Sequence, residues 1–320
     1  MANALSENRP LIVLTGPTAV GKTALSILLA KKIGGEIISA DSMQVYKRMD
    51  IGTAKIKREE MQGVPHHLID ILEPTEDFNV VIFSKLAKQL IQEIRDRGNI
   101  PILVGGTGFY IQAVLYDIDF TDTDENTGLR EELTAFAQKY GTVALHNRLK
   151  ELDPEAAEVI HENDLKRIIR GIEFATQTGG KISEHNKEMR DKKSAYNSAY
   201  FVLDMDRAVL YRRIEQRIDE MLEEGLLNEV EELRREGVTK ECVSMQGLGY
   251  KEFFDYLDGK QSLADAVAVL KRDTRHFAKR QITWFKREKD VIFLSKDETT
   301  KTEDLLEKIM EVLKEKGIVS

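Results

Sequence analysis

Eight residues near the start of the chain, GPTAVGKT (Gly16–Thr23), have the types and spacing of a phosphate-binding loop. They match G-x-x-x-x-G-K-[ST] and stand between an apolar run and a helix-like stretch. The glycines let backbone N–H groups turn toward phosphate oxygens, Lys22 adds a positive charge, and the Thr23 hydroxyl can ligate Mg²⁺. The segment predicts binding of a di- or triphosphate. The residues of this predicted diphosphate site are Gly16, Pro17, Thr18, Ala19, Val20, Gly21, Lys22 and Thr23.

An aspartate, Asp41, ends the next apolar segment and could act on whatever approaches these phosphates. Hydrolysis of ATP or GTP would need an apolar strand that ends in a Mg²⁺-positioning aspartate. The obvious strand, Ile100–Gly106, ends in glycine instead, and Asp204 and Asp206 are weaker candidates. If the diphosphate is a leaving group, Lys22 would stabilise its departing oxygens and Asp41 would activate the nucleophile as a general base.

The segments around these residues alternate between strand and helix. We expect strands over Leu11–Thr15, Gly35–Asp41 and Ile100–Gly106, and helices over Lys22–Lys32 and Asn79–Arg97. This alternation predicts an α/β fold, a P-loop-containing parallel sheet flanked by helices. In such sheets the ligand binds outside the carboxyl ends of the strands, where Gly16–Thr23, Asp41 and Thr107 all fall.

The pattern changes in the middle of the chain, and this change predicts two domains. Residues 122–197 are polar and helix-favouring, which predicts an inserted all-helical subdomain. Residues 1–121 and 198–320 would then form the P-loop catalytic core with C-terminal helices. In the second part of that core we expect a strand over Tyr200–Asp206, a strand at VIFLS and a closing helix. Three longer helices are expected there, over Leu210–Glu224, Leu226–Glu236 and Ser262–Glu288.

Composition narrows the class of protein. The chain has 320 residues, a formal net charge of −8 and one cysteine, Cys242, which excludes a disulfide framework or a multi-cysteine zinc site. It starts without a signal-peptide pattern and lacks the roughly 20 apolar residues of a membrane span, so we expect a cytoplasmic protein. Despite the acidic balance, Leu270–Lys289 carries eight Lys/Arg against two acids, which is a local basic patch suited to nucleic acid.

Five segments taken together resemble the tRNA dimethylallyltransferases, also called tRNA isopentenyltransferases. They are GPTAVGKT, DSMQVYKRMDIGTAK, PHHLID, VGGTGFY and AKRQITWF, and the likeness runs from about Leu11 to about Leu294. Enzymes of that family move a dimethylallyl group from dimethylallyl diphosphate to N6 of the adenine just 3′ of the anticodon, in tRNAs that read U-initial codons. Eukaryotic relatives carry a C-terminal zinc finger that a single cysteine cannot form, so the resemblance is to the bacterial type.

The resemblance implies the same reaction here, with Mg²⁺ as cofactor held by Thr23, and with dimethylallyl diphosphate and a tRNA anticodon stem-loop as partners. Nothing in the sequence demands a dimer, and we expect a monomer without an obligatory protein partner. Asp41 matches the general base, Lys22 and Thr23 match diphosphate ligands, and Arg217 matches an arginine that reaches the diphosphate. The positions that match tRNA contacts are Asp41, Ser42, Met43, Gln44, Thr107, Arg130, Lys166, Arg167, Ile168, Ile169, Arg170, Gln246, Gly249, Tyr250, Lys251, Arg275, Lys279, Arg280 and Gln281.

Two of these matches carry a finer expectation. The Gln44 amide suits hydrogen bonds to a base edge, and Lys166 and Arg170 should share one helix face. Three other functions stay open on the sequence alone: an adenylate isopentenyltransferase acting on a free nucleotide, a small-molecule kinase, and a non-catalytic RNA-binding protein. The basic inserted subdomain disfavours the first, the absence of a nucleotide-base signature the second, and the intact Lys22, Thr23 and Asp41 the third.

Overall fold

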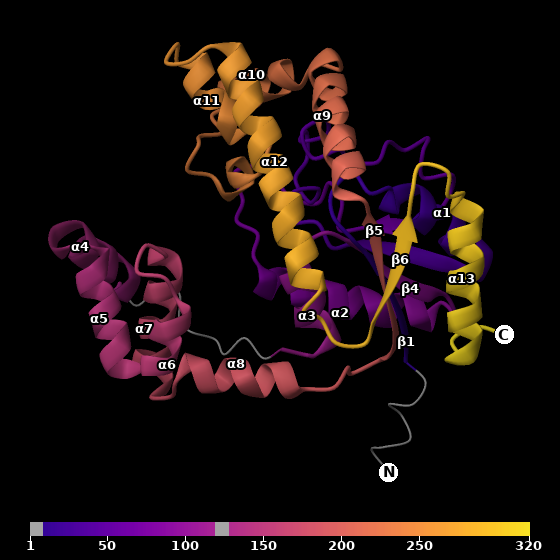
Figure 1. The fold of residues 1–320 in the computed structure, drawn as a ribbon, viewed down its shortest axis with the longest axis horizontal. Helices are drawn as coiled ribbons and strands as arrows, with labels where there is room; N and C mark the ends of the chain where they lie inside the picture. The colour runs from indigo at the N-terminus through magenta and orange to yellow at the C-terminus, as the bar shows by residue number, and fades with distance from the viewer. Residues whose placement is uncertain (1–8, 119–127) are drawn as a thin grey trace. The chain divides into compact units, whose positions relative to one another are not determined.

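The computed structural model describes residues 9–118 and 128–320, which form two compact units (Figure 1). The sheet unit consists of Met1–Leu115 and Ala195–Ser320, and the helical unit of Tyr116–Ser194. The predicted boundary between residues 121 and 122 lies outside the described residues. The predicted boundary after residue 197 is placed three residues too late, because Asn197 already donates its backbone N–H to the carbonyl of Arg9 at 3.0 Å and pairs with β1.

A single parallel sheet organises the sheet unit, as the sequence predicts. Within the described residues it has six strands in the order β3-β2-β4-β1-β5-β6. Their bounds are β1 Pro10–Thr15, β2 Gly35–Ser39, β3 His66–His67, β4 Ile100–Gly105, β5 Asn197–Met205 and β6 Val291–Lys296. Every residue of β2 is buried, and so are all but the first of β1, as expected for central strands covered on both faces. The sequence did not predict the two-residue strand β3.

Helices cover both faces of the sheet. The connection from β1 to β2 and the connection from β2 to β4 run in opposite directions across the sheet, so right-handed crossovers put α1 and α2 on opposite faces. Helix α13 packs on α1 and on β5, and α3 packs on α2. Of the described helices, none is both long enough and apolar enough to cross a membrane. The bounds are α1 Lys22–Ile33, α2 Val80–Asp96, α3 Gly108–Leu115 and α13 Thr302–Glu315.

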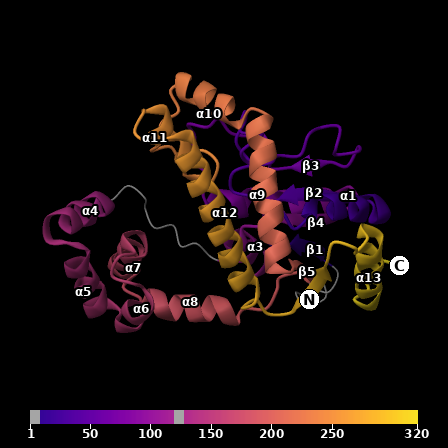
Figure 2. The same ribbon diagram turned by 45° about the horizontal axis from the view of Figure 1, so that its top comes forward.

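A second group of helices stands beyond the carboxyl ends of the strands. Helix α9 follows β5, α12 precedes β6, and the two pack side by side, with α10 and α11 at their far ends (Figure 2). Asp206 is the N-cap of α9 and accepts hydrogen bonds from the backbone of Ala208 and Val209, so this candidate for a Mg²⁺-positioning aspartate serves as a helix cap. The bounds are α9 Arg207–Glu223, α10 Leu226–Arg235, the 3₁₀ helix η1 Val243–Gln246, α11 Lys251–Leu257 and α12 Leu263–Phe285.

The helical unit has a hydrophobic core of its own. Its helices are α4 Leu129–Tyr140, α5 Thr142–Leu152, α6 Pro154–Val159, α7 Leu165–Thr178 and α8 Ile182–Asp191. Leu145 and Leu149 of α5 are fully buried against Ile168 and Ile172 of α7. The buried Asp153 accepts hydrogen bonds from Ala156 and Ser183, and so ties the start of α6 to α8. An inserted all-helical segment is therefore present.

A buried carboxylate at the start of β2 gives a first testable prediction. Glu36 accepts hydrogen bonds from Arg97 at 2.8 and 3.1 Å and from Asn99 at 2.7 Å, and it contacts His67 at 2.6 Å. Led by the Arg97 bonds, these partners lower the pKa of Glu36 to about 2. A depressed carboxyl pKa stabilises the fold above the unfolded value of 4.5, and that stability is lost as pH falls from 4.5 toward 2.

We expect the free energy of unfolding of the wild-type protein to fall by about 3 kcal/mol between pH 4.5 and 2 on account of this group alone. Urea unfolding at several pH values measures it. Glu36→Gln should be less stable at pH 7, and its free energy of unfolding should fall less steeply as pH drops from 4.5 to 2. Equal acid slopes for the two proteins would show that Glu36 is not a source of the acid sensitivity.

Candidate active site

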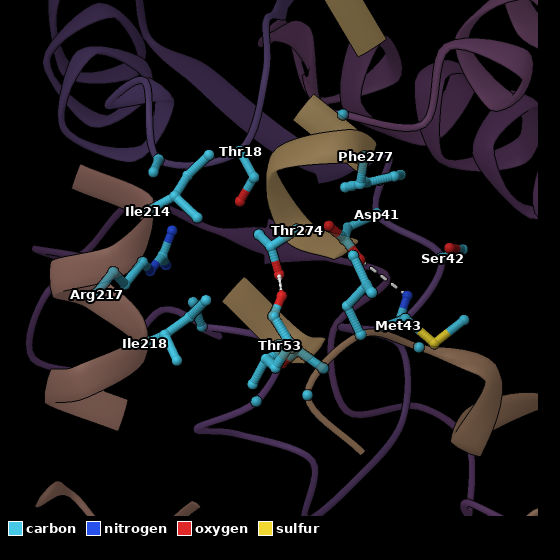
Figure 3. Close-up of a pocket in the computed structure, with 18 of the residues that line it drawn as sticks. Thr18, Asp41, Ser42, Met43, Thr53, Ile214, Arg217, Ile218, Thr274 and Phe277 are labelled. Carbon is cyan, nitrogen blue, oxygen red and sulfur yellow. Dashed lines mark hydrogen bonds between the residues drawn. The ribbon is translucent and has the colours of Figure 1, made fainter. Parts of the chain in front are cut away.

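A pocket in the sheet unit lies at the carboxyl ends of the central strands (Figure 3). Its volume is about 320 Å³, and known small-molecule sites occupy about 300–1,000 Å³. It is polar beside the phosphate-binding loop and after β2, and apolar where α9 and α12 close it. The lining residues are Thr18, Ala19, Asp41, Ser42, Met43, Gly52, Thr53, Ala54, Gly106, Thr107, Ile214, Arg217, Ile218, Met221, Gln246, Gly247, Leu248, Gly249, Lys251, Leu270, Thr274, Phe277, Arg280 and Gln281.

The phosphate-binding loop joins β1 to α1, and two glycines shape it. Gly16 has a φ of +142°, and a Cβ there would lie 2.5 Å from the carbonyl oxygen of Leu203 on β5. Gly21 has a φ of +100° and precedes α1 without offering a side chain to the first N–H groups of that helix. Unpaired N–H groups at a helix N-terminus attract anions. The loop therefore has the backbone geometry that phosphate binding requires.

Two positive side chains and one carboxylate interact electrostatically at this end of the pocket. Burial lowers the pKa of Lys22 to about 8, while Asp41 acts to raise it and Arg217 to lower it. Burial also lowers the pKa of Arg217, against the attraction of Asp41. Lys22 donates hydrogen bonds to the carbonyls of Gly16 and Pro17 at 2.9 and 2.8 Å. Asp41 and Arg217 thus line the pocket from two elements, and the charges of both act on Lys22 in the phosphate-binding loop.

Asp41 is held by the turn that follows β2. Its Oδ1 accepts a hydrogen bond from the backbone N–H of Met43 at 2.9 Å (Figure 3) and another from the backbone N–H of Gln44 at 3.4 Å. The preceding residue, Ala40, packs so closely on Gly105 that a Cβ at Gly105 would lie 2.3 Å from its carbonyl oxygen. Among the described residues no donor reaches Oδ2 of Asp41. One carboxylate oxygen therefore orients the side chain, and the other stays available to a substrate.

Gln281 is buried and connects two loops of the site. Its Oε1 accepts a hydrogen bond from the Thr18 backbone N–H at 2.9 Å, and its Nε2 donates to the Gly106 carbonyl at 3.0 Å. The side chain also fills the space that a Cβ at Gly106 would need, at 2.3 Å. Sequence reasoning placed Gln281 among the tRNA contacts. In the structure its amide is occupied by the phosphate-binding loop and the turn after β4.

The loop from Asp50 to Ala54 forms another wall of the pocket, and hydrogen bonds that involve three polar side chains hold it. Glu229 of α10 accepts three backbone N–H bonds from the loop, at 2.8–3.1 Å, and the Tyr250 hydroxyl at 2.7 Å. The Gln44 amide donates to the Thr53 and Ala54 carbonyls at 3.3 and 3.4 Å, and accepts from Ser39.

These contacts change how two predicted tRNA contacts are understood. Tyr250 is fully buried, and its ring fills the space beside Gly52, where a Cβ would lie 2.6 Å away. The Gln44 amide, expected to contact a base edge, is instead hydrogen-bonded to the loop, and Gln44 does not line the pocket. Both residues position a wall of the site because their polar atoms already have partners inside the protein.

The other predicted tRNA contacts of the sheet unit divide into two groups. Ser42, Met43, Thr107, Gln246, Gly249, Lys251 and Arg280 line the pocket. Arg275 instead pairs with Glu215 of α9, next to a similar pair between Lys271 and Asp219, so these side chains join α9 to α12. Lys279 is exposed on α12.

In the helical unit, α7 carries most of the predicted contacts. Lys166, Arg167 and Arg170 are exposed, and Lys166 and Arg170 lie one helical turn apart, as predicted. Ile168 and Ile169 were also matched to tRNA contacts, but their side chains are buried in the core of the unit. They can contact a ligand only through their backbone. Arg130 forms two hydrogen bonds with Glu173, at 3.0 and 2.7 Å.

The predicted metal ligand, Thr23, sits in the first turn of α1. It is exposed, and no described residue makes a hydrogen bond with its hydroxyl, so that oxygen is available as a ligand. The described residues hold no cluster of three His, Cys, Asp or Glu side chains suited to a metal. Mg²⁺ usually keeps several waters and binds through one or two protein oxygens plus substrate phosphates. A lone hydroxyl beside a phosphate-binding loop fits this pattern.

Sequence reasoning missed the apolar wall of the pocket. Ile214 and Ile218 of α9 face Phe277 of α12 across the space beside Thr53 (Figure 3). Ile214 and Ile218 are one helical turn apart, which is a visible signal of a buried stripe. The stripe alone could not distinguish a pocket wall from ordinary core.

Comparison with known proteins gives a consistent result. The family model described as IPP transferase matches residues 44–288. A curated tRNA dimethylallyltransferase from Lachnoclostridium phytofermentans is 58% identical over 97% of this chain and 99% of its own length. One from Bacillus licheniformis is 54% identical over 88% of this chain and 89% of its own length.

Two solved structures are similar along nearly the whole chain. A full-length tRNA isopentenylpyrophosphate transferase from Bacillus halodurans is 46% identical, with a TM-score of 0.73 over 97% of this chain and 98% of that chain. A eukaryotic dimethylallyltransferase solved acting on tRNA is 30% identical, with a TM-score of 0.84 over 97% of this chain and 79% of that chain. On this similarity of sequence and fold, the chain belongs to the IPP transferase family, among the bacterial tRNA dimethylallyltransferases.

Proposed function

We propose that this chain transfers the dimethylallyl group of dimethylallyl diphosphate to N6 of the adenine 3′-adjacent to the anticodon, in tRNAs that read U-initial codons. The products are N6-isopentenyladenosine and diphosphate. One observation carries the proposal: the phosphate-binding loop and Asp41 meet in one pocket that also has an apolar wall, formed by Ile214, Ile218 and Phe277. The names of the similar proteins support it.

The diphosphate belongs at the phosphate-binding loop. Backbone N–H groups at the start of α1, with Lys22 and Arg217, would bind its oxygens. The Thr23 hydroxyl would hold Mg²⁺, which when bound neutralises charge on those oxygens. The five-carbon group would then lie against Ile214 and Ile218, where apolar contact excludes water.

The transfer step needs one base and one electrostatic site. The bond between C1 of the dimethylallyl group and the diphosphate oxygen breaks, and the departing diphosphate keeps the electron pair. Lys22 and Arg217 stabilise the charge that develops on it. N6 of the adenine forms the new bond to C1, and Oδ2 of Asp41 takes the proton that N6 loses.

The RNA would enter at the other side of the pocket. A loop base can be unstacked and turned into a pocket at modest cost, which is how single-stranded RNA is usually read. Ser42, Met43 and Thr107 lie beside Asp41 at the pocket wall, so the adenine belongs there. The exposed Lys166 and Arg170 of α7 are suited to phosphates of the anticodon stem. We place this reaction in the cytoplasm and assign it to a monomer.

A direct test uses radiolabelled dimethylallyl diphosphate, Mg²⁺ and two acceptors in parallel. One acceptor is an unmodified tRNA whose anticodon ends in adenine and is followed by adenine, and the other is AMP. Label in the tRNA alone is expected. Label in AMP would move the protein to the nucleotide-modifying branch, and ATP consumption without label in either would identify a kinase.

The depressed pKa of Lys22 predicts how diphosphate binding depends on pH. Lys22 loses its proton as pH rises through about 8, so the affinity for inorganic diphosphate should fall above that pH by up to about tenfold per pH unit. Calorimetric titration from pH 7 to 9.5 measures the dependence. Lys22→Met should bind weakly at every pH and keep only the pH dependence of diphosphate itself. The same slope in both proteins would contradict the assignment.

A further inference from the structure

Two positive side chains that the mechanism does not use lie against the phosphate-binding loop. Arg213 of α9 donates a hydrogen bond from Nε to the Ala19 carbonyl at 3.0 Å. Lys296, the last residue of β6, places its Nζ 3.1 Å from where a Cβ at Gly21 would stand. Neither side chain lines the pocket. They come from separate elements and reach the same loop from outside the pocket.

The acids next to Lys296 in the chain are engaged elsewhere. Oδ1 of Asp297 accepts hydrogen bonds from the backbone and hydroxyl groups of Thr299 and Thr300, at 2.6–2.9 Å. Glu298 pairs with Arg212 at 3.0 Å. Across residues 9–118 and 128–320, no carboxylate forms an ion pair with Arg213 or Lys296. The local sequence therefore leaves this pair of charges uncompensated.

The two positive charges stand close enough to repel each other. Burial lowers the pKa of Lys296, and Arg213 lowers it further. Arg213 also acts on Arg217, one helical turn along α9, and lowers its pKa. Positive groups thus follow one another from the pocket past the loop to the surface. The repulsion among Arg213, Lys296 and Arg217 is unfavourable, and a bound anion would reduce it.

We propose that Arg213 and Lys296 form an outer diphosphate subsite on the solvent side of the phosphate-binding loop. The subsite captures the diphosphate group of the incoming substrate before Lys22 and Arg217 bind it, and it receives the diphosphate released by the reaction. This inference rests on the proposed function, because it assumes a diphosphate substrate. Clustered positive charge beside a binding cleft raises the local concentration of an anion and its rate of association.

The test compares Lys296→Met, Arg213→Gln and the double variant with wild type. The probe is inorganic diphosphate, titrated calorimetrically at low and high salt. Steady-state assays on the same proteins give kcat and the KM values for dimethylallyl diphosphate and tRNA. Lys308→Met on α13 is the charge-matched control, since Lys308 is exposed and forms no ion pair or side-chain hydrogen bond with a residue that the structure describes.

We expect each single variant to weaken diphosphate binding and to raise the KM for dimethylallyl diphosphate about fivefold to tenfold, and the double variant to do so further. The loss should shrink at high salt. The tRNA KM and kcat should stay within about twofold of wild type. Glutamine keeps a donor for the Ala19 carbonyl, and Lys296→Met removes no hydrogen bond to a described residue, so neither change should disturb the loop.

Two results would overturn the subsite. One is a double variant that binds diphosphate like wild type. The other is a rise in the tRNA KM with diphosphate binding unchanged, which would assign the pair to the RNA backbone. If wild type labels tRNA and the double variant binds diphosphate normally, only the subsite is wrong. If wild type binds no diphosphate, the proposed function is wrong as well.

Discussion

Replacing Asp41 by asparagine is expected to lower kcat by about 10²–10⁴-fold, the usual contribution of a positioned general base. Asparagine retains Oδ1, which accepts the hydrogen bonds of Met43 and Gln44, so the turn after β2 should keep its shape. The change removes the negative charge and the basic oxygen Oδ2. Single-turnover transfer of label to tRNA measures the chemical step, and equilibrium titration with each substrate checks that both still bind.

A second measurement separates loss of the base from general damage to the site. Asp41 raises the pKa of Lys22. Removing the charge of Asp41 should therefore lower that pKa, so that the affinity for diphosphate begins to fall at a lower pH. Asp204→Asn is the matched control, because Asp204 also accepts a backbone bond near the end of a strand but does not line the pocket. An Asp41→Asn protein that binds both substrates and keeps near-normal turnover would exclude Asp41 as the base.

The elements that carry the site could be predicted because their signals are local. Each of the strands β1, β2 and β4 is a short apolar run that ends near a glycine or an aspartate, and each was predicted to within about two residues. In a parallel sheet the carboxyl ends of all strands lie at one edge. This reasoning places Lys22, Asp41 and Thr107 at one edge of the sheet, where the structure has them.

The roles of buried amides and hydroxyls could not be predicted from residue type. Gln44, Tyr250 and Gln281 all carry groups suited to RNA, and the structure gives all three internal partners instead. A sequence shows that a glutamine can form hydrogen bonds, but not whether an orphaned backbone group lies within reach. That depends on contacts between segments up to 263 residues apart, as between Thr18 and Gln281.

The same limit applies to charge. The basic stretch from Leu270 to Lys289 was correctly found, yet Arg275 in it pairs with a glutamate 60 residues away. Lys296, outside that stretch, lies against the phosphate-binding loop. The sequence therefore shows that this helix is basic. Ion pairing in the folded structure decides which of its charged side chains are available to bind a ligand.

Arg217→Gln should lower kcat/KM for dimethylallyl diphosphate by about 10²–10³-fold, the range for removing one donor to a developing negative charge. The Arg217 guanidinium has no hydrogen bond or ion pair to any residue that the structure describes, so its loss should not disturb other contacts. Arg217→Lys should recover part of the activity, since lysine restores the charge without the planar pair of donors. Arg235→Gln on α10, an exposed arginine paired within its own helix, is the charge-matched control.

The pH dependence distinguishes an electrostatic role from a structural one. Arg217 lowers the pKa of Lys22, so its removal should raise that pKa above about 8 and move the alkaline limb of diphosphate binding to higher pH. This shift is opposite in sign to the shift expected for Asp41→Asn. A variant that merely loosened the loop would expose Lys22 to solvent and also raise its pKa. It would, however, raise the KM for tRNA and weaken the affinity for diphosphate together. If the KM for tRNA is unchanged and the fall in diphosphate affinity moves to higher pH, Arg217 acts on the leaving group. If that fall stays at the same pH, this role is contradicted.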